Sequence, residues 1–138
     1  MRSSVSHIYT VEFRVSGRSL DPDAVTTALE LMPAYVHRVG ERIGRKTRET
    51  NTWVYNGYDD REQVEWPDLE EGLQFVLDRL WSRRHALEPF SAVAECYWWC
   101  GHFQSSFDGG PRLSPGLLSR LGQIGAALCI DNYFSADP

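Results

Sequence analysis

Cysteine and histidine are the residue types in this chain best suited to metal binding or nucleophilic chemistry. Cys96, Cys100 and His102 are neighbours in the sequence, but they fall within one expected strand. At about 3.3 Å per residue, Cys96 and Cys100 are roughly 13 Å apart along that strand. A zinc ion with bonds of about 2.0–2.3 Å cannot join both. Only Cys100 and His102 are close enough to share an ion, and they need the help of Cys129. We therefore expect small buried cysteines under the helices.

The histidines do not indicate a catalytic site. His7, His37, His85 and His102 are scattered along the chain, and none belongs to a local Ser-His-Asp or Cys-His signature. The sequence therefore predicts no catalytic residue, no metal ion and no cofactor, and it favours a protein that is not an enzyme.

Residues 40–47 imitate a phosphate-binding loop with the sequence Gly-Glu-Arg-Ile-Gly-Arg-Lys-Thr. The functional motif needs four residues between its glycines and a lysine directly after the second glycine. Here three residues separate Gly40 from Gly44, and Arg45 precedes Lys46. We therefore predict a plain basic loop rather than a nucleotide site.

Charge is unevenly distributed in this chain of net charge −5. Residues 37–50 are basic, whereas residues 59–71 hold acidic side chains against the single cation Arg61. Two solvated loops that attract each other are the simplest interpretation, and a binding role for either is the alternative. The net charge disfavours a nucleic-acid partner, because backbone binding needs a concentrated basic field.

The composition is that of an ordinary globular protein, with 42% hydrophobic and 24% charged residues. No apolar run approaches the roughly 18–20 residues of a membrane helix. The N-terminal residues lack the features of a signal peptide, and three cysteines cannot all pair. We expect a cytoplasmic protein with no membrane partner.

Alternating residue types predict a half-exposed strand over residues 7–16. Two helices are predicted where Asp21 and Ser114 each precede a proline, because these side chains cap backbone N–H groups and proline fits the first turn. Apolar residues at helical spacing predict a third helix over residues 69–80. Further strands are expected over residues 35–41, 51–56, 93–103 and 127–134.

These elements follow the order β-α-β-β-α-β-α-β. Alternating strands do not suit a doubly wound parallel sheet, whose strands are buried on both faces. We therefore predict one α+β domain over residues 1–138. Its architecture is expected to be a two-layer sandwich, ferredoxin-like or related, with a largely antiparallel sheet and helices on one face. Residues 1–6 and 135–138 are predicted to be flexible tails.

A sheet covered on one side only leaves alternate side chains on the other side. Large exposed apolar patches seldom lack a role, so this side is a candidate binding surface. The alternative is a second small core, in which long loops cover the rings. The candidate binding residues are Glu12, Arg14, Glu95, Tyr97, Trp99, Asp131 and Tyr133.

Several segments resemble a known family. They are Leu20-Asp21-Pro22-Asp23, Leu31-Met32-Pro33, Gly40, Trp53, Leu77 with Leu80, Leu121-Gly122, and Leu128-Cys129-Ile130-Asp131-Asn132-Tyr133. Together with the leading strand that ends at Gly17, they are similar to bacterial proteins classed as domain of unknown function 4279. The resemblance implies a stand-alone bacterial cytoplasmic domain, and it implies no activity.

Three functions fit these observations. The first is a protein-binding module that uses the open sheet face, for example an immunity or inhibitor protein whose acidic charge suits a basic toxin. The second is a small-molecule-binding protein or hydrolase that uses Glu95, Asp131 and His102 in a pocket. The third is a structural domain that self-associates as a homodimer.

Overall fold

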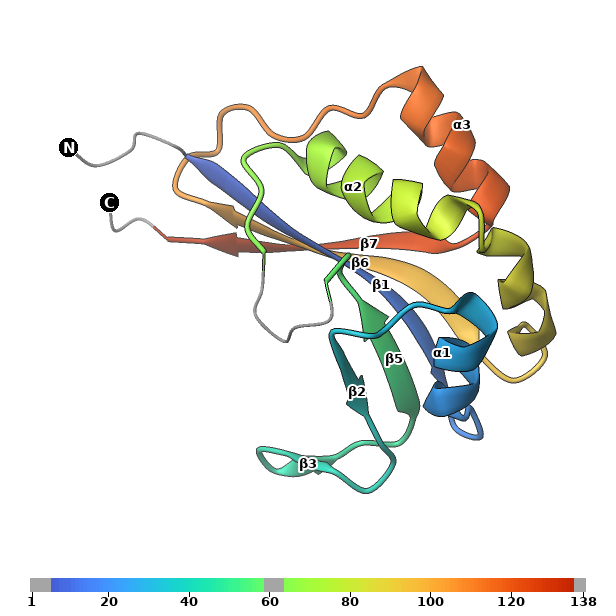
Figure 1. The fold of residues 1–138 in the computed structure, drawn as a ribbon. Helices are drawn as coiled ribbons and strands as arrows, with labels where there is room; N and C mark the ends of the chain where they lie inside the picture. Colours follow the sequence, from blue (N-terminus) through green and yellow to red (C-terminus); the bar gives the residue numbers. More distant parts are fainter. Residues whose placement is uncertain (1–5, 59–63, 136–138) are drawn as a thin grey trace.

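The computed structural model describes residues 6–58 and 64–135. Two sheets and four helical elements make up this part of the chain (Figure 1). In chain order they are β1 (His7–Gly17), α1 (Pro22–Leu29), β2 (Tyr35–His37), β3 (Arg42–Ile43), β4 (Lys46–Thr47), β5 (Asn51–Tyr55), α2 (Leu69–Trp81), the 3-10 helix η1 (Arg84–Phe90), β6 (Glu95–Gln104), α3 (Pro115–Ile124) and β7 (Ala127–Phe134).

The main sheet has five strands in the order β2-β5-β1-β6-β7. Three of its pairings are antiparallel, and the pairing of β6 with β7 is parallel because α3 crosses over between them. The α+β class and the largely antiparallel sheet are therefore confirmed, in an open sheet that is mixed. A ferredoxin-like order is not confirmed.

Local capping chemistry begins two of the helices as the sequence predicts. The Asp21 carboxylate accepts the backbone N–H of Asp23, with Pro22 in the first turn of α1. The Ser114 hydroxyl accepts the N–H of Leu117 at the start of α3. At its other end, α1 stops at Leu29, and the capping residue Glu30 adopts a left-handed conformation with φ of 55°.

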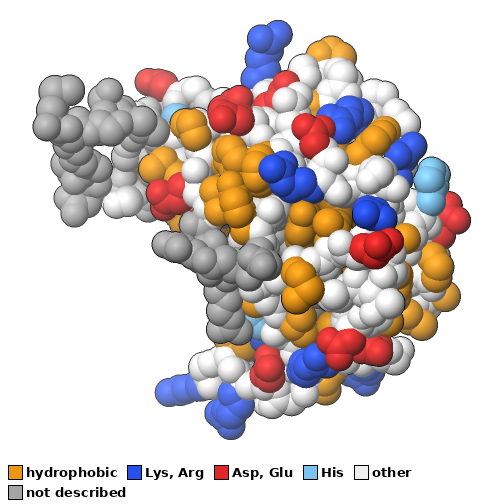
Figure 2. Space-filling view, viewed as in Figure 1, with side chains coloured by type: hydrophobic (Ala, Val, Ile, Leu, Met, Phe, Trp, Pro, Cys, Tyr) orange, Lys and Arg blue, Asp and Glu red, His pale blue; other side chains and the backbone are white. Residues whose placement is uncertain are grey.

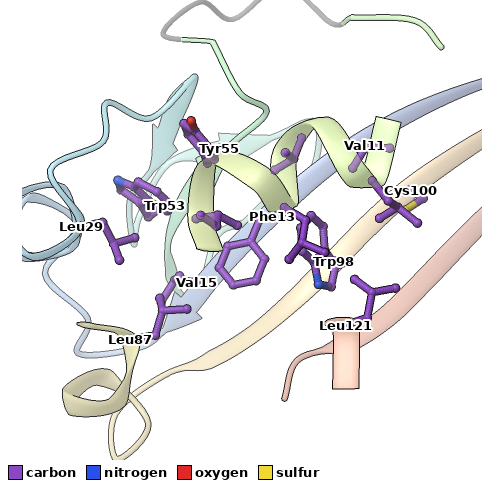
Figure 3. Packing of buried hydrophobic residues seen from close by; sticks show 14 of the residues in the cluster. Val11, Phe13, Val15, Leu29, Trp53, Tyr55, Leu87, Trp98, Cys100 and Leu121 are labelled. Carbon is purple, nitrogen blue, oxygen red and sulfur yellow. The ribbon is translucent and has the colours of Figure 1, made fainter. Parts of the chain in front are cut away.

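The core lies between the helices and one face of the sheet (Figures 1 and 3). Every strand residue in it follows the alternation expected from the sequence, so that Val11, Phe13 and Val15 of β1 face Trp98 and Cys100 of β6. These side chains pack against leucines of α1, α2 and α3. Among the residues that the structure describes, no helix lies over the opposite face of the sheet (Figure 1).

Some expectations about local structure are wrong. The strand expected over residues 35–41 ends at His37, and a two-stranded hairpin of β3 and β4 follows it. Ser6 and Ser135, expected in flexible tails, are held by backbone bonds to Ser105 and Gln104. The remaining tail residues lie outside the described part of the chain.

The cysteines only partly follow the prediction of burial under the helices. Cys100 is buried and Cys96 half-buried, whereas Cys129 is exposed because its side chain points to the helix-free face of the edge strand. Across residues 6–58 and 64–135, no helix has the length and apolar character needed to cross a bilayer.

Candidate functional site

The predicted binding residues all lie on the helix-free face, because the sheet register aligns them across three strands. Glu12 and Arg14 of β1 stand opposite Trp99 and Tyr97 of β6. On the other side of β6, Cys129 of β7 lies beside Trp99. The alignment divides the face into two halves with different exposure.

Glu12 is the centre of the first half, and it is only 2% exposed. One of its carboxylate oxygens accepts two bonds from the Arg14 guanidinium, at 2.9 Å from Nε and 2.5 Å from Nη2. The other oxygen accepts the hydroxyl of Tyr35 at 2.8 Å. Such two-atom Arg–carboxylate bonding fixes both side chains. Glu12 is thus on the predicted face, but it is too buried to meet a partner.

The ionisation of this network follows from burial and from the Glu12 charge. Burial lowers the pKa of Arg14, but the adjacent Glu12 carboxylate more than compensates, and the net direction is upward. Burial and the neighbouring negative charge of Glu12 raise the pKa of Tyr35 to about 12. At neutral pH the Arg14 guanidinium is therefore charged and the Tyr35 phenol is neutral.

Val54 of β5 shows that this half of the face is closed. It stands between Arg14 and Tyr35 in the sheet register, and its exposure is 0% although no helix covers this side. We call Glu12, Arg14, Tyr35 and Val54 the closed half. The sequence does not predict Tyr35 as a site residue, because nothing in its short strand indicates that its hydroxyl reaches Glu12 of β1.

The second half of the face exposes rings. Trp99 is half-buried, its indole N–H donates to the Asp131 carboxylate at 2.7 Å, and the Arg14 guanidinium lies 4.8 Å from its ring centroid. Further along, the rings of Phe103 and Tyr133 stack with centroids 4.9 Å apart, and they are 37% and 45% exposed. We call Tyr97, Trp99, Phe103, Asp131 and Tyr133 the aromatic half.

Gly101 is what allows this ring arrangement. A Cβ atom at this position would lie 2.9 Å from the ring of Phe103 and 2.7 Å from the Thr10 hydroxyl. The Phe103 ring therefore leans across the glycine, between β1 and β7. A side chain at position 101 would displace the ring that stacks on Tyr133.

Glu95 lies two residues before Tyr97 on the same face of β6, but far from Asp131. It stands opposite Ser16 at the start of β6, whereas Asp131 of β7 stands beside Gly101, six residues further along β6. At the start of β6, Glu95 lines a pocket of about 550 Å³ between η1 and the turn that joins α3 to β7. Polar residues at this pocket include Arg84, His85, Glu88 and Gln123.

Cys96 also lines this pocket, but its thiol is not activated. Burial, and secondarily the charge of Glu95, raise the pKa of Cys96 to about 11. A nucleophilic cysteine needs the thiolate, which a lowered pKa supplies. Cys96 is therefore a packing residue at neutral pH.

The structure does not assemble the carboxylate and histidine site considered above. Six residues of strand separate Glu95 from the level of Asp131, which is roughly 20 Å. His102 points to the helix side of the sheet, where its ring stacks on Tyr9 with centroids 4.6 Å apart. Glu95, Asp131 and His102 therefore cannot act on one substrate.

His102 instead belongs to a histidine pair that the sequence does not reveal. Its Nε2 lies 2.8 Å from Nδ1 of His7, and its Nδ1 lies 2.7 Å from Oδ1 of Asn132. Nε2 of His7 donates to the carbonyl of Asp108 at 2.7 Å, since a carbonyl only accepts. The two imidazole rings are therefore joined by one hydrogen bond. The only signal for it is the antiparallel register of β1 and β6.

The basic loop folds as the β3–β4 hairpin and stays exposed, as Figures 1 and 2 show. Its flanking ion pairs join Arg38 to Asp23 and Arg18 to Glu49. Within residues 64–71, the described part of the acidic run, no carboxylate pairs with it. The predicted attraction of the two runs is therefore not seen there, and residues 59–63 lie outside the described chain.

Metal-binding residues do not gather anywhere in the described chain. No group of three His, Cys, Asp or Glu side chains there is close enough to hold one ion. Cys100 and His102 share the helix side of the sheet, whereas Cys129 points to the opposite side. The three-ligand set considered from the sequence is therefore not assembled.

The fold and the helix-free face together define a small α+β domain with an open mixed sheet. A family model described as "Domain of unknown function (DUF4279)" matches residues 7–135, and the chain belongs to this family. No curated protein and no solved structure matches the chain. The family description assigns no activity, so function has to be argued from the surface itself.

Proposed function

We propose that the chain is a protein-binding module whose aromatic half recognises a partner with basic side chains. The observation that carries the proposal is the stacked, solvent-exposed pair of Phe103 and Tyr133 beside the Asp131 carboxylate. Aromatic residues are enriched in the centres of protein interfaces, where they supply large apolar contact area. A sheet face with no helix over it gives them a flat platform.

The rigidity of these side chains also supports binding. Trp99 is held on one side by its hydrogen bond to Asp131 and on the other by the Arg14 guanidinium. Arg14 is itself fixed by Glu12. Ordering a mobile side chain at an interface costs about 0.5–1.5 kcal/mol, so a ring that is already ordered binds at lower cost.

Electrostatics favours a basic partner. Asp131 and Glu95 are exposed on this face, whereas the Arg14 charge is neutralised by Glu12. The net charge of the whole chain is −5. Complementary charge accelerates association and excludes acidic competitors. An immunity or inhibitor protein against a basic toxin is one concrete form of this function.

A capture experiment tests the proposal. The wild-type protein and the Trp99→Ala/Tyr133→Ala variant are immobilised and exposed to the same cell extract and to purified basic candidate toxins. Ile43→Ala provides the matched control, because Ile43 is also an exposed apolar residue but lies on the hairpin. We expect the same protein to bind the wild type and the control and to be lost from the double variant. Equal capture by all three contradicts the proposal.

The pocket beside Glu95 supports a second candidate, the binding of a small polar molecule. Its volume of about 550 Å³ is within the usual range for ligand sites, and its wall carries charges of both signs. A panel of metabolites can be screened for a rise in the Tm of the wild type. Gln123→Trp, which fills the pocket from α3, should abolish any such rise, and a rise that persists in this variant rejects the pocket.

A further inference from the structure

The two edges of the main sheet differ in length and protection. β2 spans three residues at one edge, whereas β7 spans eight residues at the other, with no proline, no lysine and no bulge. Natural proteins normally shorten or charge such edges, because an unprotected edge pairs with another strand. The β7 edge is thus available for pairing along its length.

The hydrogen-bond pattern shows which groups face this edge. The N–H of Ser135 donates to the carbonyl of Gln104 in β6. The backbone N–H and C=O groups of successive residues alternate in direction along a strand. Those of Tyr133, Asp131 and Cys129 therefore also point toward β6. The N–H and C=O groups that point to the free edge are those of Leu128, Ile130, Asn132 and Phe134.

Few charged residues lie in this edge strand or in the segment that leads into it. Residues 113–134 contain only Arg120 and Asp131 as charged residues, in a chain that is 24% charged overall. Arg120 is paired with Asp78 at 2.7 Å, and Asp131 accepts the indole N–H of Trp99. Depletion of charge is typical of an interface core. Exposed apolar side chains on this flank are Phe103, Phe107, Leu118, Tyr133 and Phe134.

We propose that β7 pairs antiparallel with β7 of a second copy and forms a symmetric dimer with one continuous sheet. In an antiparallel pair of two such edges, hydrogen bonds form only between residues whose backbone N–H and C=O groups both point to the free edge. Two registers satisfy this condition and pair most of the length of β7. In one the two-fold axis passes through Ile130, and in the other it passes through Asp131. An axis at Asp131 sets two carboxylates directly opposite each other, which is destabilising.

The axis at Ile130 avoids this repulsion. It places Asp131 opposite Cys129 of the second copy, and the large Tyr133 opposite the small Ala127. The outward groups of Leu128 then bond to those of Asn132, and the two Ile130 residues bond to each other. The strand is thus compatible with its own copy: no like charges meet, and the large Tyr133 meets the small Ala127. This fit identifies the occupant as a second copy. The two aromatic halves lie on the same face of the joined sheet, with Tyr133 and Asp131 beside the dimer seam. Backbone pairing of β7 needs no ligand on that face, so the dimer does not depend on the proposed function.

Substitutions at Cys129 test both the dimer and its register, because this side chain is exposed and small. Sedimentation equilibrium should give a mass that approaches twice 15.8 kDa as the concentration rises. Cys129→Lys places a cation opposite Asp131 of the second copy at two symmetric positions, and we expect it to lower the dimer Kd about tenfold. Cys129→Asp places like charges there and should raise the Kd by about the same factor.

Asn132→Pro supplies an independent test. It removes an N–H that points to the free edge, and it also removes the side-chain bond between Asn132 and His102. The backbone pairing of β7 with β6 is spared, and the variant should be a monomer. A wild type that is monomeric at every accessible concentration overturns the proposal. So does a dimer that Cys129→Asp leaves unchanged. If both Cys129 variants weaken the dimer, the axis is not at Ile130 and the proposed register is wrong.

Discussion

The two halves of the helix-free face lie side by side on one sheet, yet they protect their side chains in opposite ways. In the closed half, Glu12 bonds both Arg14 and Tyr35, and Val54 between them is fully buried without a helix above it. In the aromatic half, Phe103 and Tyr133 stack on each other and remain exposed.

A sheet face without a helix over it is therefore not exposed to solvent over its whole area. A charged network can replace a helix as a cover, because satisfied buried charges hold their side chains flat over the strand below. Two rings that stack only on each other cannot cover the strand in this way, since their edges and outer faces stay in contact with water. Only the aromatic half therefore has contact area to offer a partner.

Glu12→Ala is expected to have the largest effect on the free energy of unfolding. It removes the acceptor of both Arg14 and Tyr35 and leaves the guanidinium, whose side chain is 22% exposed, without its counter-charge. Breaking a buried pair costs about 3–5 kcal/mol, and we expect about 3 kcal/mol because Arg14 keeps some water. Urea unfolding measures this value. Glu95→Ala, an exposed carboxylate on the same face, is the control and should cost less than about 0.5 kcal/mol.

Val54→Ala tests whether the closed half is a packed layer. Removal of two methylene-sized groups from a fully buried site should cost about 2 kcal/mol, from the transfer free energy and the residual cavity. Cys129→Ala, in the uncovered part of β7, should change stability by less than about 0.5 kcal/mol. Equal losses in the two variants would show that the closed half is not closed.

Tyr35→Phe tests the network through its pH dependence. Loss of the hydroxyl should cost about 1 kcal/mol at neutral pH. The pKa of Tyr35 is raised from 10.0 to about 12 in the folded chain, so the folded state binds the proton more tightly than the unfolded state does. Its contribution is therefore complete below pH 10 and is lost as the pH rises from 10 to about 12. Urea midpoints of both proteins across this range check the result, and a constant difference contradicts it.

Much of the fold follows from local patterns in the sequence. Period two assigns Val11 and Phe13 to the core and Glu12 and Arg14 to the other face, and proline after a capping residue begins two helices. What these patterns do not contain is strand order. The parallel neighbour of β6 and the position of β2 depend on tertiary packing.

For the candidate site, too, the sequence predicts which residues share a face but not which residues meet. The alternation places Trp99, Asp131 and Tyr133 on one face, but the burial of Glu12 depends on Tyr35, which comes from the far edge of the sheet. The meeting of His7 with His102 depends likewise on the register of β1 and β6. Contacts between strands distant in sequence leave no periodic signal, so only the structure reveals them.

Tyr133→Ala should have the smallest effect on stability and the clearest effect on recognition. The ring is 45% exposed and contacts mainly Phe103, so its removal should cost less than about 1 kcal/mol in urea unfolding. Its loss should nevertheless weaken capture of a partner by the aromatic half, because a ring at an interface centre supplies binding energy out of proportion to its role in folding. A large loss of stability would instead place Tyr133 in a second core, and the two halves of the face would then be alike.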